Sequence, residues 1–349
     1  QTTANVTVGH AVTGVCYNSF DNTVFTANRN SSSVSVVDGA ADSVVTTTAT
    51  GVAAGRLCYN PVHDRVYAVG YDTVLVLDAA TNSVIGSIDV YSPGGLCYNP
   101  TDDKLYFSCR YLNCVAVFDG VADTLIAEAP TGDWPCALCY NPISDLVYCA
   151  NYGSWWPFDS TVTVIDGVTN QVVATVQVDP APVSLCHNSV NNKVYCANGR
   201  GHSVTVIDGC SNEVIATVPI TNGEPKSVCY SSSSNKVYCF TWEGPVTVIS
   251  GEGNNTIGTF QGTEYPTDIC YEASGNKLYF TSEYASLIYV LDCASDSTVA
   301  TIPVGHDPRS LCLDTINRRL YCANYGFHPS NLAVALARAG TDSVIKTIV

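Results

Sequence analysis

Methionine is absent from this chain of 349 residues, and basic residues are scarce. The 15 Lys and Arg stand against 31 Asp and Glu, which gives a net charge of −16. Because nucleic-acid phosphates are bound by basic surfaces, this balance argues against a nucleic-acid partner. No apolar run approaches the roughly 18–20 residues that a membrane span needs, so no membrane-spanning segment is expected. The missing methionine, even at position 1, is interpreted as a mature product whose export signal has been removed.

Known catalytic signatures are missing as well. The chain contains no G-x-S-x-G, Walker loop, H-E-x-x-H or dinucleotide-binding fingerprint. These motifs place a nucleophile, a phosphate, a zinc ion or a dinucleotide in a defined geometry. We therefore predict that the protein is not an enzyme and that it carries no cofactor, with a divalent metal as the one alternative considered below.

Cysteine, in contrast, is abundant, with 17 residues. An odd number leaves at least one thiol unpaired or paired with another chain. The cysteine content and the three N-x-S/T sequons at Asn5, Asn30 and Asn254 indicate an extracellular or cell-surface protein, with the periplasm as the alternative. The sequons are candidate glycosylation sites, although a chain rich in Ser and Thr also contains a few such triplets by chance.

A repeat fills the chain. Eight times a Cys lies nine residues before a Tyr, or once before a Phe: the cysteines are Cys16, Cys58, Cys97, Cys139, Cys186, Cys229, Cys270 and Cys312. A period near 42 residues indicates stacked copies of one supersecondary unit. We predict a single domain over 1–349, with copies beginning near residues 11, 53, 92, 134, 181, 224, 265 and 307.

Each copy contains four strand-like segments, which we call A to D. In the fifth copy they read SLCHN, KVYCAN, SVTVID and EVIATV, with polar turn residues between them. Runs rich in Val, Ile, Tyr and Thr at hairpin spacing are typical of antiparallel strands. Four strands per copy, repeated around an axis, predict an all-β fold, an eight-bladed β-propeller of four-stranded antiparallel blades, with seven blades as the alternative.

Length variation is confined to one end of the predicted blades. Six residues separate the end of strand C from the start of strand D in every copy, as from Asp166 to Val172. The distance from the strand B aromatic to the end of strand C varies from 11 residues (Tyr67 to Asp78) to 18 (Tyr148 to Asp166). The B–C and D–A loops share one end of a blade, so this end is the candidate functional surface.

The Asp at the end of strand C is expected to be structural. It occurs at Asp38, Asp78, Asp119, Asp166, Asp208 and Asp292. Such a side chain can accept hydrogen bonds from its own turn backbone. The copies do not bring enough carboxylates together to favour a calcium site.

These motifs resemble a known family. LCYNP, KVYCAN, VTVIDG and NxVIATV together are similar to the YVTN-type β-propeller repeat of archaeal and bacterial surface-layer and exported proteins. The resemblance covers the whole chain and implies a binding or structural scaffold without a shared catalytic set. Two copies depart from it: the eighth has NLAVALARAG in place of V-I-D-G, and the sixth has Ser250 in place of the Asp.

The chain contains one D-type segment too many for eight blades. Residues 1–8 align with residues 297–304, so they are interpreted as an extra outer strand, and residues 343–349 form another. The surplus strand could add a fifth strand to one blade, pair with a neighbouring molecule, or belong to a longer array. The first alternative is favoured, and the second is the one that would join subunits.

Four A–B hairpins carry cysteine in both strands. A hairpin centred on Ser144 would place Cys139 opposite Cys149, and the same register pairs Cys186 with Cys196, Cys229 with Cys239 and Cys312 with Cys322. Opposed positions are close to what a disulfide requires. Free cysteines that act as small buried apolar side chains are an equally good interpretation. Cys109 and Cys114 flank a short B–C turn and could also form a disulfide.

Candidate site residues lie on the predicted loop end. Ring closure would bring His10, His306 and His328 onto adjacent loops, where three imidazoles could hold a divalent metal, although solvated histidines are the favoured interpretation. The two longest B–C loops contribute the candidate binding residues Tyr152, Trp155, Trp156, Phe158, Phe327 and His328. Large apolar groups on loops anchor interfaces or stack on sugars, or they form a lid over the channel.

We therefore expect an exported scaffold that mediates protein interaction or self-assembly, as in a surface layer or filament. Its partner would be a protein or a second copy, or a carbohydrate, bound through the variable loops. Exchange of a terminal strand is the further means by which copies could join. The alternative is a periplasmic enzyme or redox subunit with a metal site on the same surface.

Overall fold

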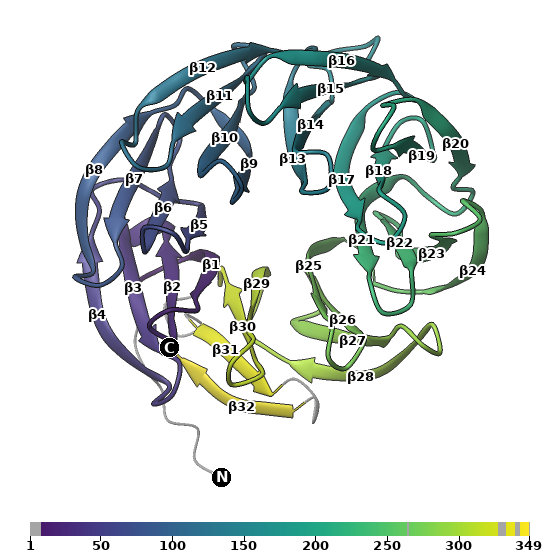
Figure 1. Cartoon of the computed structure of the whole chain (residues 1–349). Helices are drawn as coiled ribbons and strands as arrows, with labels where there is room; N and C mark the ends of the chain where they lie inside the picture. The colour runs from purple at the N-terminus through teal and green to yellow at the C-terminus, as the bar shows by residue number, and fades with distance from the viewer. Residues whose placement is uncertain (1–7, 264, 327–332, 339–342, 349) are drawn as a thin grey trace. The chain divides into compact units, whose positions relative to one another are not determined.

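The computed structural model describes residues 8–263, 265–326, 333–338 and 343–348 (Figure 1). It contains eight four-stranded antiparallel sheets, and the strands of each sheet follow one another in chain order. The protein is therefore an all-β eight-bladed propeller, as the repeat predicts. Among the residues described, the helical element is a single 3-10 turn, η1 (Arg29–Ser31), and no helix there is long and apolar enough to cross a membrane.

The chain divides into two compact units. The first unit comprises Gln1–Asp89 and Tyr265–Val349, and the second comprises Val90–Glu264. In the first unit the strands are β1 (Val12–Asn18), β2 (Thr23–Asn28), β3 (Ser33–Asp38), β4 (Ser43–Ala49), β5 (Arg56–Asn60), β6 (Arg65–Val69), β7 (Thr73–Asp78), β8 (Ser83–Asp89), β25 (Pro266–Glu272), β26 (Lys277–Ser282), β27 (Leu287–Asp292), β28 (Ser297–Pro303), β29 (Pro308–Asp314), β30 (Arg319–Asn324), β31 (Ala333–Arg338) and β32 (Ser343–Ile348).

The second unit holds the other four sheets. Its strands are β9 (Pro93–Asn99), β10 (Lys104–Cys109), β11 (Cys114–Asp119), β12 (Leu125–Pro130), β13 (Pro135–Asn141), β14 (Leu146–Asn151), β15 (Thr161–Asp166), β16 (Val172–Gln177), β17 (Pro182–Asn188), β18 (Lys193–Asn198), β19 (Ser203–Asp208), β20 (Val214–Pro219), β21 (Pro225–Ser231), β22 (Lys236–Thr241), β23 (Pro245–Ser250) and β24 (Thr256–Gln261). Every sheet thus repeats the A-B-C-D order.

Burial within a sheet follows the strand order. Strands B and C are buried along almost their whole length, whereas strand D is largely exposed, as β18 and β20 illustrate. The strand B aromatic is fully buried in every copy: Phe25, Tyr67, Tyr106, Tyr148, Tyr195, Tyr238, Tyr279 and Tyr321. Within each unit the middle strands of adjacent sheets pack against one another, which explains their continuously apolar sequences.

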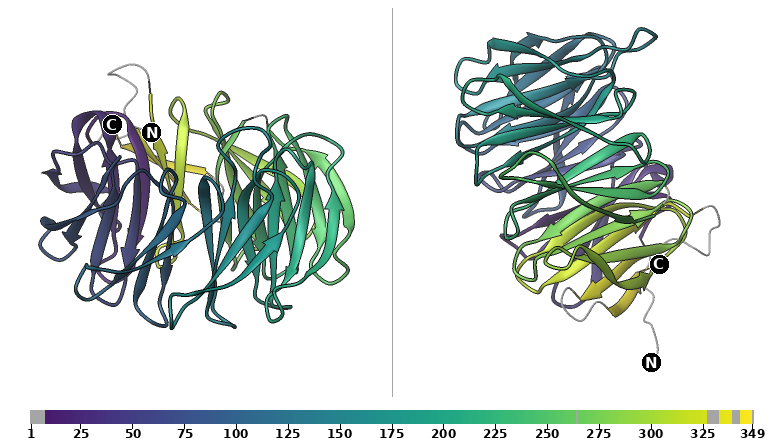
Figure 2. Two further views of the ribbon diagram at one scale, coloured as in Figure 1. Left: turned by 90° about the horizontal axis from the view of Figure 1, so that it is seen from above. Right: turned by 90° about the vertical axis from the view of Figure 1, so that its right-hand side faces the viewer.

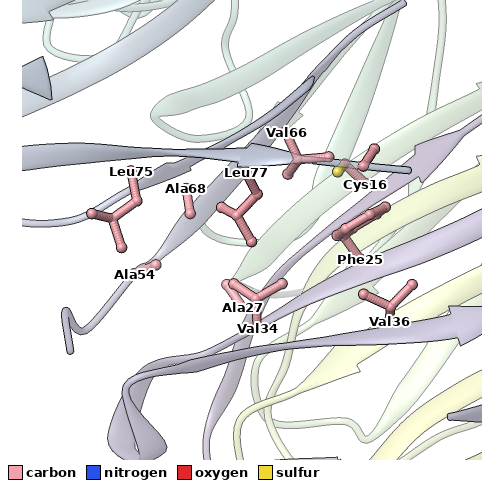
Figure 3. Packing of buried hydrophobic residues seen from close by; sticks show 11 residues of the cluster. Cys16, Phe25, Ala27, Val34, Val36, Ala54, Val66, Ala68, Leu75 and Leu77 are labelled. Carbon is pink, nitrogen blue, oxygen red and sulfur yellow. The ribbon is translucent and has the colours of Figure 1, made fainter. Parts of the chain in front are cut away.

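The core forms between adjacent sheets. In the first unit, Phe25 and Val36 of the first sheet join Val66 and Leu77 of the second in one cluster (Figure 3). Cys16 belongs to the same cluster and is 8% exposed. The repeated strand A cysteine is thus placed between sheets, where its thiol serves as a small apolar group.

Sheet order fixes the position of the connections. Because consecutive strands are antiparallel neighbours, the A–B and C–D turns lie at one end of each sheet, and the B–C and D–A loops lie at the other (Figure 2). We call these the turn end and the loop end. Within each unit the long, variable connections are therefore at the loop end, as predicted.

Asparagine side chains link neighbouring A–B turns. Asn188 Oδ1 accepts hydrogen bonds from the backbone N–H groups of Val190 (2.9 Å) and Asn191 (3.1 Å), and its Nδ2 donates to Asn235 Oδ1 of the next turn (2.9 Å). The same link joins Asn18 to Asp64, Asn99 to Asp145 and Asn141 to Asn192. The repeated Asn therefore both closes its own turn and ties adjacent sheets together.

The C–D turns use the Asp at the end of strand C as predicted. Asp208 Oδ1 accepts the N–H groups of Cys210 (3.0 Å) and Ser211 (2.8 Å). Equivalent bonds occur at Asp38, Asp78, Asp119, Asp166 and Asp292. These carboxylates are confirmed as structural turn residues.

The first and last copies are neighbours in the first unit. Val12 and Val24 share a buried cluster with Tyr321 and Leu336. Arg319 contacts Asp42 of the first sheet through an ion pair. The predicted adjacency of copies one and eight is confirmed.

The C-terminal segment supplies the outer strand of the eighth sheet. β32 pairs with β31 in an antiparallel register, so this sheet has its own fourth strand. Each of the eight sheets is thereby complete with four strands. The predicted extra strand over residues 1–8 lies outside the described residues, apart from Val8, which is buried at 4% exposure.

The predicted A–B register is wrong by one residue. Cys139 lies opposite Tyr148, and Cys149 lies opposite Leu138. The turn contains four residues, 142–145, and its last residue, Asp145, has a left-handed backbone (φ 51°). The predicted hairpin is centred on Ser144 and so has an odd number of turn residues. Four turn residues place the centre between two residues and move the pairing by one position, and successive side chains of a strand point to opposite faces.

The predicted hairpin disulfides therefore lose their geometric basis. The same register separates Cys186 from Cys196, Cys229 from Cys239 and Cys312 from Cys322. Cys139, Cys149, Cys186, Cys196, Cys312 and Cys322 are reduced thiols in the structure, and so are Cys109 and Cys114. Cys109 and Cys114 differ from the other pairs because they do lie directly opposite each other.

Candidate binding face

Exposed aromatic side chains gather at the loop end. Nine aromatic residues are strongly exposed in the described part of the chain, and eight of them lie on B–C or D–A connections: Tyr71, Tyr91, Tyr111, Trp155, Trp156, Trp242, Tyr265 and Tyr284. The ninth, Phe20, lies on an A–B turn. Aromatic side chains that could have been buried are instead presented to solvent at one end of the sheets in each unit.

In the second unit, one aromatic group spans three connections. Tyr111, on the turn between β10 and β11, lies with its ring centroid 4.9 Å from that of Trp134 and 6.0 Å from that of Tyr91. The Tyr111–Trp134 contact is edge-to-face, the arrangement that the ring quadrupoles favour. Trp134 is also tied to the turn because its backbone N–H donates to Asn113 Oδ1 (3.0 Å). The three rings form one apolar surface.

The four candidate aromatic residues on the loop between β14 and β15 fall into two pairs with different surroundings. Trp155 and Trp156 are 82% and 85% exposed, so these two rings do not form the packed lid that was the alternative interpretation. Tyr152 and Phe158 instead pack against each other, with centroids 5.5 Å apart. The structure thus presents two of the four predicted residues to solvent and uses the other two as support.

A carboxylate pair holds this loop. Asp133 Oδ2 accepts hydrogen bonds from the backbone N–H (2.6 Å) and the hydroxyl (2.7 Å) of Ser154. Asp159 Oδ2 accepts the backbone N–H of Asp133 (2.7 Å). The donated bonds from Ser154 hold the pKa of the Asp133 carboxyl below its ordinary value. The ionised carboxylate is therefore the form that orders the tryptophan loop.

Cations stack on several of the loop-end rings. Lys226 Nζ lies 3.8 Å from the Trp242 ring centroid, and the Arg200 guanidinium lies 5.6 Å from that of Phe158. In the first unit, Arg309 lies 5.7 Å from the Tyr325 ring centroid. Such cation–π contacts are individually modest, but they fix the orientation of an exposed ring.

Arg309 is also held by two carboxylates. Its guanidinium contacts Asp307 (2.7 Å) and Glu283 (3.1 Å). Partial burial by itself would lower the pKa of Arg309, but the two carboxylates outweigh it and the pKa is raised. Nearby, Tyr265 and Tyr284 meet edge to face with centroids 5.1 Å apart. The first unit therefore repeats the combination of exposed rings and charged groups.

The predicted histidine site is only partly described. His10 and His306 are exposed, and His328 and Phe327 lie outside the described residues. Over 8–263, 265–326 and the two final strands, no group of three or more His, Cys, Asp or Glu is placed to hold a metal. The metal site therefore stays a prediction that rests on His328.

The sequons have different surroundings. Asn30 is exposed on η1, whereas the half-buried Asn254 accepts a hydrogen bond from Lys193 Nζ (2.9 Å) through its side-chain oxygen. Asn5 lies outside the described residues. Glycosylation of the three remains a prediction.

The strand A thiols have the properties of small, buried apolar side chains. Burial raises the pKa of Cys58 and Cys139 to about 12. A thiol with so high a pKa is protonated at neutral pH and is a poor nucleophile or metal ligand. The apolar interpretation of these cysteines therefore has physical support.

Comparison with known proteins shows the fold. No family model matches the chain, and no curated protein matches it, so the YVTN-type resemblance is not confirmed. Among solved structures, the computationally designed Ika8 protein is similar at 14% identity and a TM-score of 0.72, over 90% of this chain and 93% of that one.

Two enzymes are also similar in structure. Kuenenia stuttgartiensis hydrazine synthase matches at 19% identity and a TM-score of 0.65, over 98% of this chain and 99% of that one. The dihydro-heme d1 dehydrogenase NirN, in complex with DHE, matches at 13% identity and a TM-score of 0.67, over 83% of this chain and 64% of that one. At these identities the likeness extends to the propeller fold and not to an activity.

Proposed function

We propose that this protein is an exported, cell-surface binding scaffold whose loop end recognises a protein partner. The observation that carries the proposal concerns the described residues, in which eight of nine exposed aromatic side chains lie on B–C and D–A connections. Trp, Tyr and Arg are the residues enriched at the energetic centres of protein interfaces. A carbohydrate, which stacks on the same rings, is the competing ligand.

The charge and the sequence motifs support the location. A net charge of −16 keeps a protein soluble and disfavours acidic partners. The cysteine content and the similarity of the motifs to YVTN-type repeats favour an exported product. An enzymatic role on the same surface remains the alternative, since two structurally similar proteins are enzymes.

The test compares the two ends of the sheets. Wild type, the double variant Trp155→Ala/Trp156→Ala and the turn-end control Phe20→Ala are immobilised as baits for extracellular proteins and for a glycan panel. We expect one protein to be retained by wild type and by the control, and about tenfold less by the double variant, which corresponds to about 1.4 kcal/mol. Equal retention on all three baits, or glycan binding alone, would contradict the proposal.

Self-assembly through an outer strand is the second candidate function. Its specific support is β32, which completes the eighth sheet, so that all eight sheets have a fourth strand without residues 1–8. A strand that adds to the open edge of another copy would join molecules through backbone hydrogen bonds. Deletion of residues 1–8 should then reduce the particle mass in sedimentation velocity, and an unchanged monomer before and after deletion would exclude this function.

A further inference from the structure

Two cysteines flank the turn that carries Tyr111. Cys109 is the last residue of β10, Cys114 is the first residue of β11, and the register places them directly opposite each other. Both are buried, at 2% and 8% exposure. Only four residues, 110–113, lie between them. This hairpin is the loop-end connection from which Tyr111 reaches Trp134.

This arrangement is specific to one hairpin. In the other described strand pairs, cysteines face different residue types: Cys139 faces Tyr148, Cys196 faces Leu185, and Cys322 faces Leu311. Directly opposed residues have Cβ atoms about 4.5–5.5 Å apart, and a disulfide needs about 3.5–4.5 Å. A shift of roughly 1 Å therefore closes the Cys109–Cys114 pair, whereas the other hairpin cysteines point to opposite faces of their sheet.

The two thiols are chemically unequal. They share a hydrogen bond, which lowers the pKa of Cys109 even though burial acts in the opposite direction. The same hydrogen bond, together with burial, raises the pKa of Cys114. In this hydrogen-bonded pair we take Cys109 as the attacking thiol and Cys114 as the resolving thiol. Thiol–disulfide exchange needs one thiolate that attacks the small disulfide and a second thiol that resolves the mixed disulfide.

We propose that Cys109 and Cys114 form a reversible disulfide that fixes the four-residue turn carrying Tyr111. The oxidant is a small disulfide of the glutathione class. The Cys109 thiolate attacks one of its sulfurs, breaks the sulfur–sulfur bond and expels one small thiolate. Cys114 gives its proton to that thiolate, attacks the Cys109 sulfur and expels the second small thiolate, which takes up the proton first lost by Cys109.

Atoms and electrons balance in this exchange. Two protein thiols are oxidised to one disulfide, and one small disulfide is reduced to two thiols. Access requires the turn to open, because both sulfurs are nearly covered. The turn is held by four hydrogen bonds outside the β10–β11 ladder: Leu112 N–H to Cys109 O (3.2 Å), Arg110 N–H to Ser92 O (3.3 Å), Thr131 N–H to Asn113 O (2.9 Å) and Trp134 N–H to Asn113 Oδ1 (3.0 Å). Opening the turn therefore leaves the hydrogen bonds of the sheet in place. The inference does not depend on a partner being bound at the loop end.

Cleavage sites make the pair easy to detect. Trypsin cuts after Lys104 and Arg110, and a Glu-specific protease cuts after Glu128. Cys109 then lies on the peptide 105–110, and Cys114 is the only cysteine of the peptide 111–128. The folded full-length protein is equilibrated in glutathione buffers of increasing oxidation, its free thiols are alkylated, and the two peptides are followed by mass spectrometry.

We expect the peptides 105–110 and 111–128 to be joined in oxidising buffer and released by reduction, with one midpoint. Cys139 and Cys58 should stay reduced over the same range. A pair that stays reduced in the most oxidising buffer, or a Cys114 that links to another cysteine first, would overturn the proposal. This measurement on wild type requires no variant to fold.

Variants then test the order of attack. Cys114→Ala should leave glutathione attached to Cys109, whereas Cys109→Ala should leave Cys114 largely unmodified. Cys149→Ala is the matched control, since Cys149 is equally buried but lies opposite Leu138. The control should retain the linked peptides, and loss of the link in that variant would contradict the assignment.

Discussion

At the turn end of the sheets the connections repeat the same side chains from copy to copy, whereas the exposed aromatic side chains of the loop end differ between copies. Asn188 and its equivalents close A–B turns and bond to the next sheet, and Asp208 and its equivalents close C–D turns. The loop end has Trp155 and Trp156 in one copy and Tyr284 in another. Recurrence therefore identifies residues that build the propeller, and variation identifies residues that are available for recognition.

The largest difference in stability between a residue that builds the propeller and a residue available for recognition is expected when an aromatic ring is removed. Tyr195 is fully buried, and its hydroxyl donates to Asn254 Oδ1 (3.2 Å). We expect Tyr195→Ala to lower the free energy of unfolding by about 3–5 kcal/mol, because it leaves a cavity between sheets. Trp156→Ala, at 85% exposure, should change it by less than about 0.5 kcal/mol.

Denaturant titration of the two variants measures this difference. A large loss of stability in Trp156→Ala would mean that the loop supports the fold and is not a free recognition surface. A small loss in Tyr195→Ala would show that the inter-sheet core tolerates the cavity, and the assignment of the repeated aromatic to structure would fail.

A smaller effect is expected from the turn-end asparagine. Asn188 is fully buried and serves two backbone N–H groups and the neighbouring Asn235. Asn188→Ala should cost about 1–3 kcal/mol, since it removes the acceptor of the Val190 and Asn191 N–H groups and the bond to Asn235. Asn222, exposed on a loop-end connection, is the matched control, and Asn222→Ala should be neutral within about 0.5 kcal/mol. Equal losses in both variants, measured by thermal unfolding, would remove the distinction between the two ends.

Much of this architecture is predictable from the sequence for a physical reason. The 42-residue period specifies four strands, and antiparallel order alone then places the connections at two ends. The turn role of Asp208 is also predictable, because its acceptor and its donors are two and three residues apart. Local chemistry at fixed spacing leaves few alternatives.

The predicted A–B register is wrong by one residue, although the sequence contains a signal for the correct one. The last turn residue is Asp or Asn in seven copies, as at Asp145 and Asn192, and these residues tolerate the left-handed backbone that both adopt. The bond from Asn188 to Asn235 could not be predicted, because it depends on how two sheets pack. The same holds for the Tyr111–Trp134 contact, which joins side chains from two connections.

The smallest expected effects concern acid. Hydrogen bonds from the Thr169 backbone N–H and hydroxyl lower the pKa of Asp166 at the turn end, and those from Ser154 lower the pKa of Asp133 at the loop end. A carboxyl whose folded pKa is depressed contributes stability above its ordinary pKa of about 4, and this contribution is lost as the pH falls through the folded value. The stability that the Asp166 and Asp133 carboxylates contribute should therefore decline below about pH 4.

Neutralising each carboxyl separates the two contributions. Asp166→Asn should flatten the dependence of unfolding free energy on pH, because the turn no longer loses a charge-assisted acceptor in acid. Asp133→Asn should instead change the tryptophan fluorescence of the Trp155/Trp156 loop at neutral pH and leave global unfolding nearly unchanged, since Asp133 orders a connection and not a sheet. If Asp133→Asn shifts global unfolding as much as Asp166→Asn does, the loop end takes part in holding the blades together, and its aromatic residues must be counted as structural.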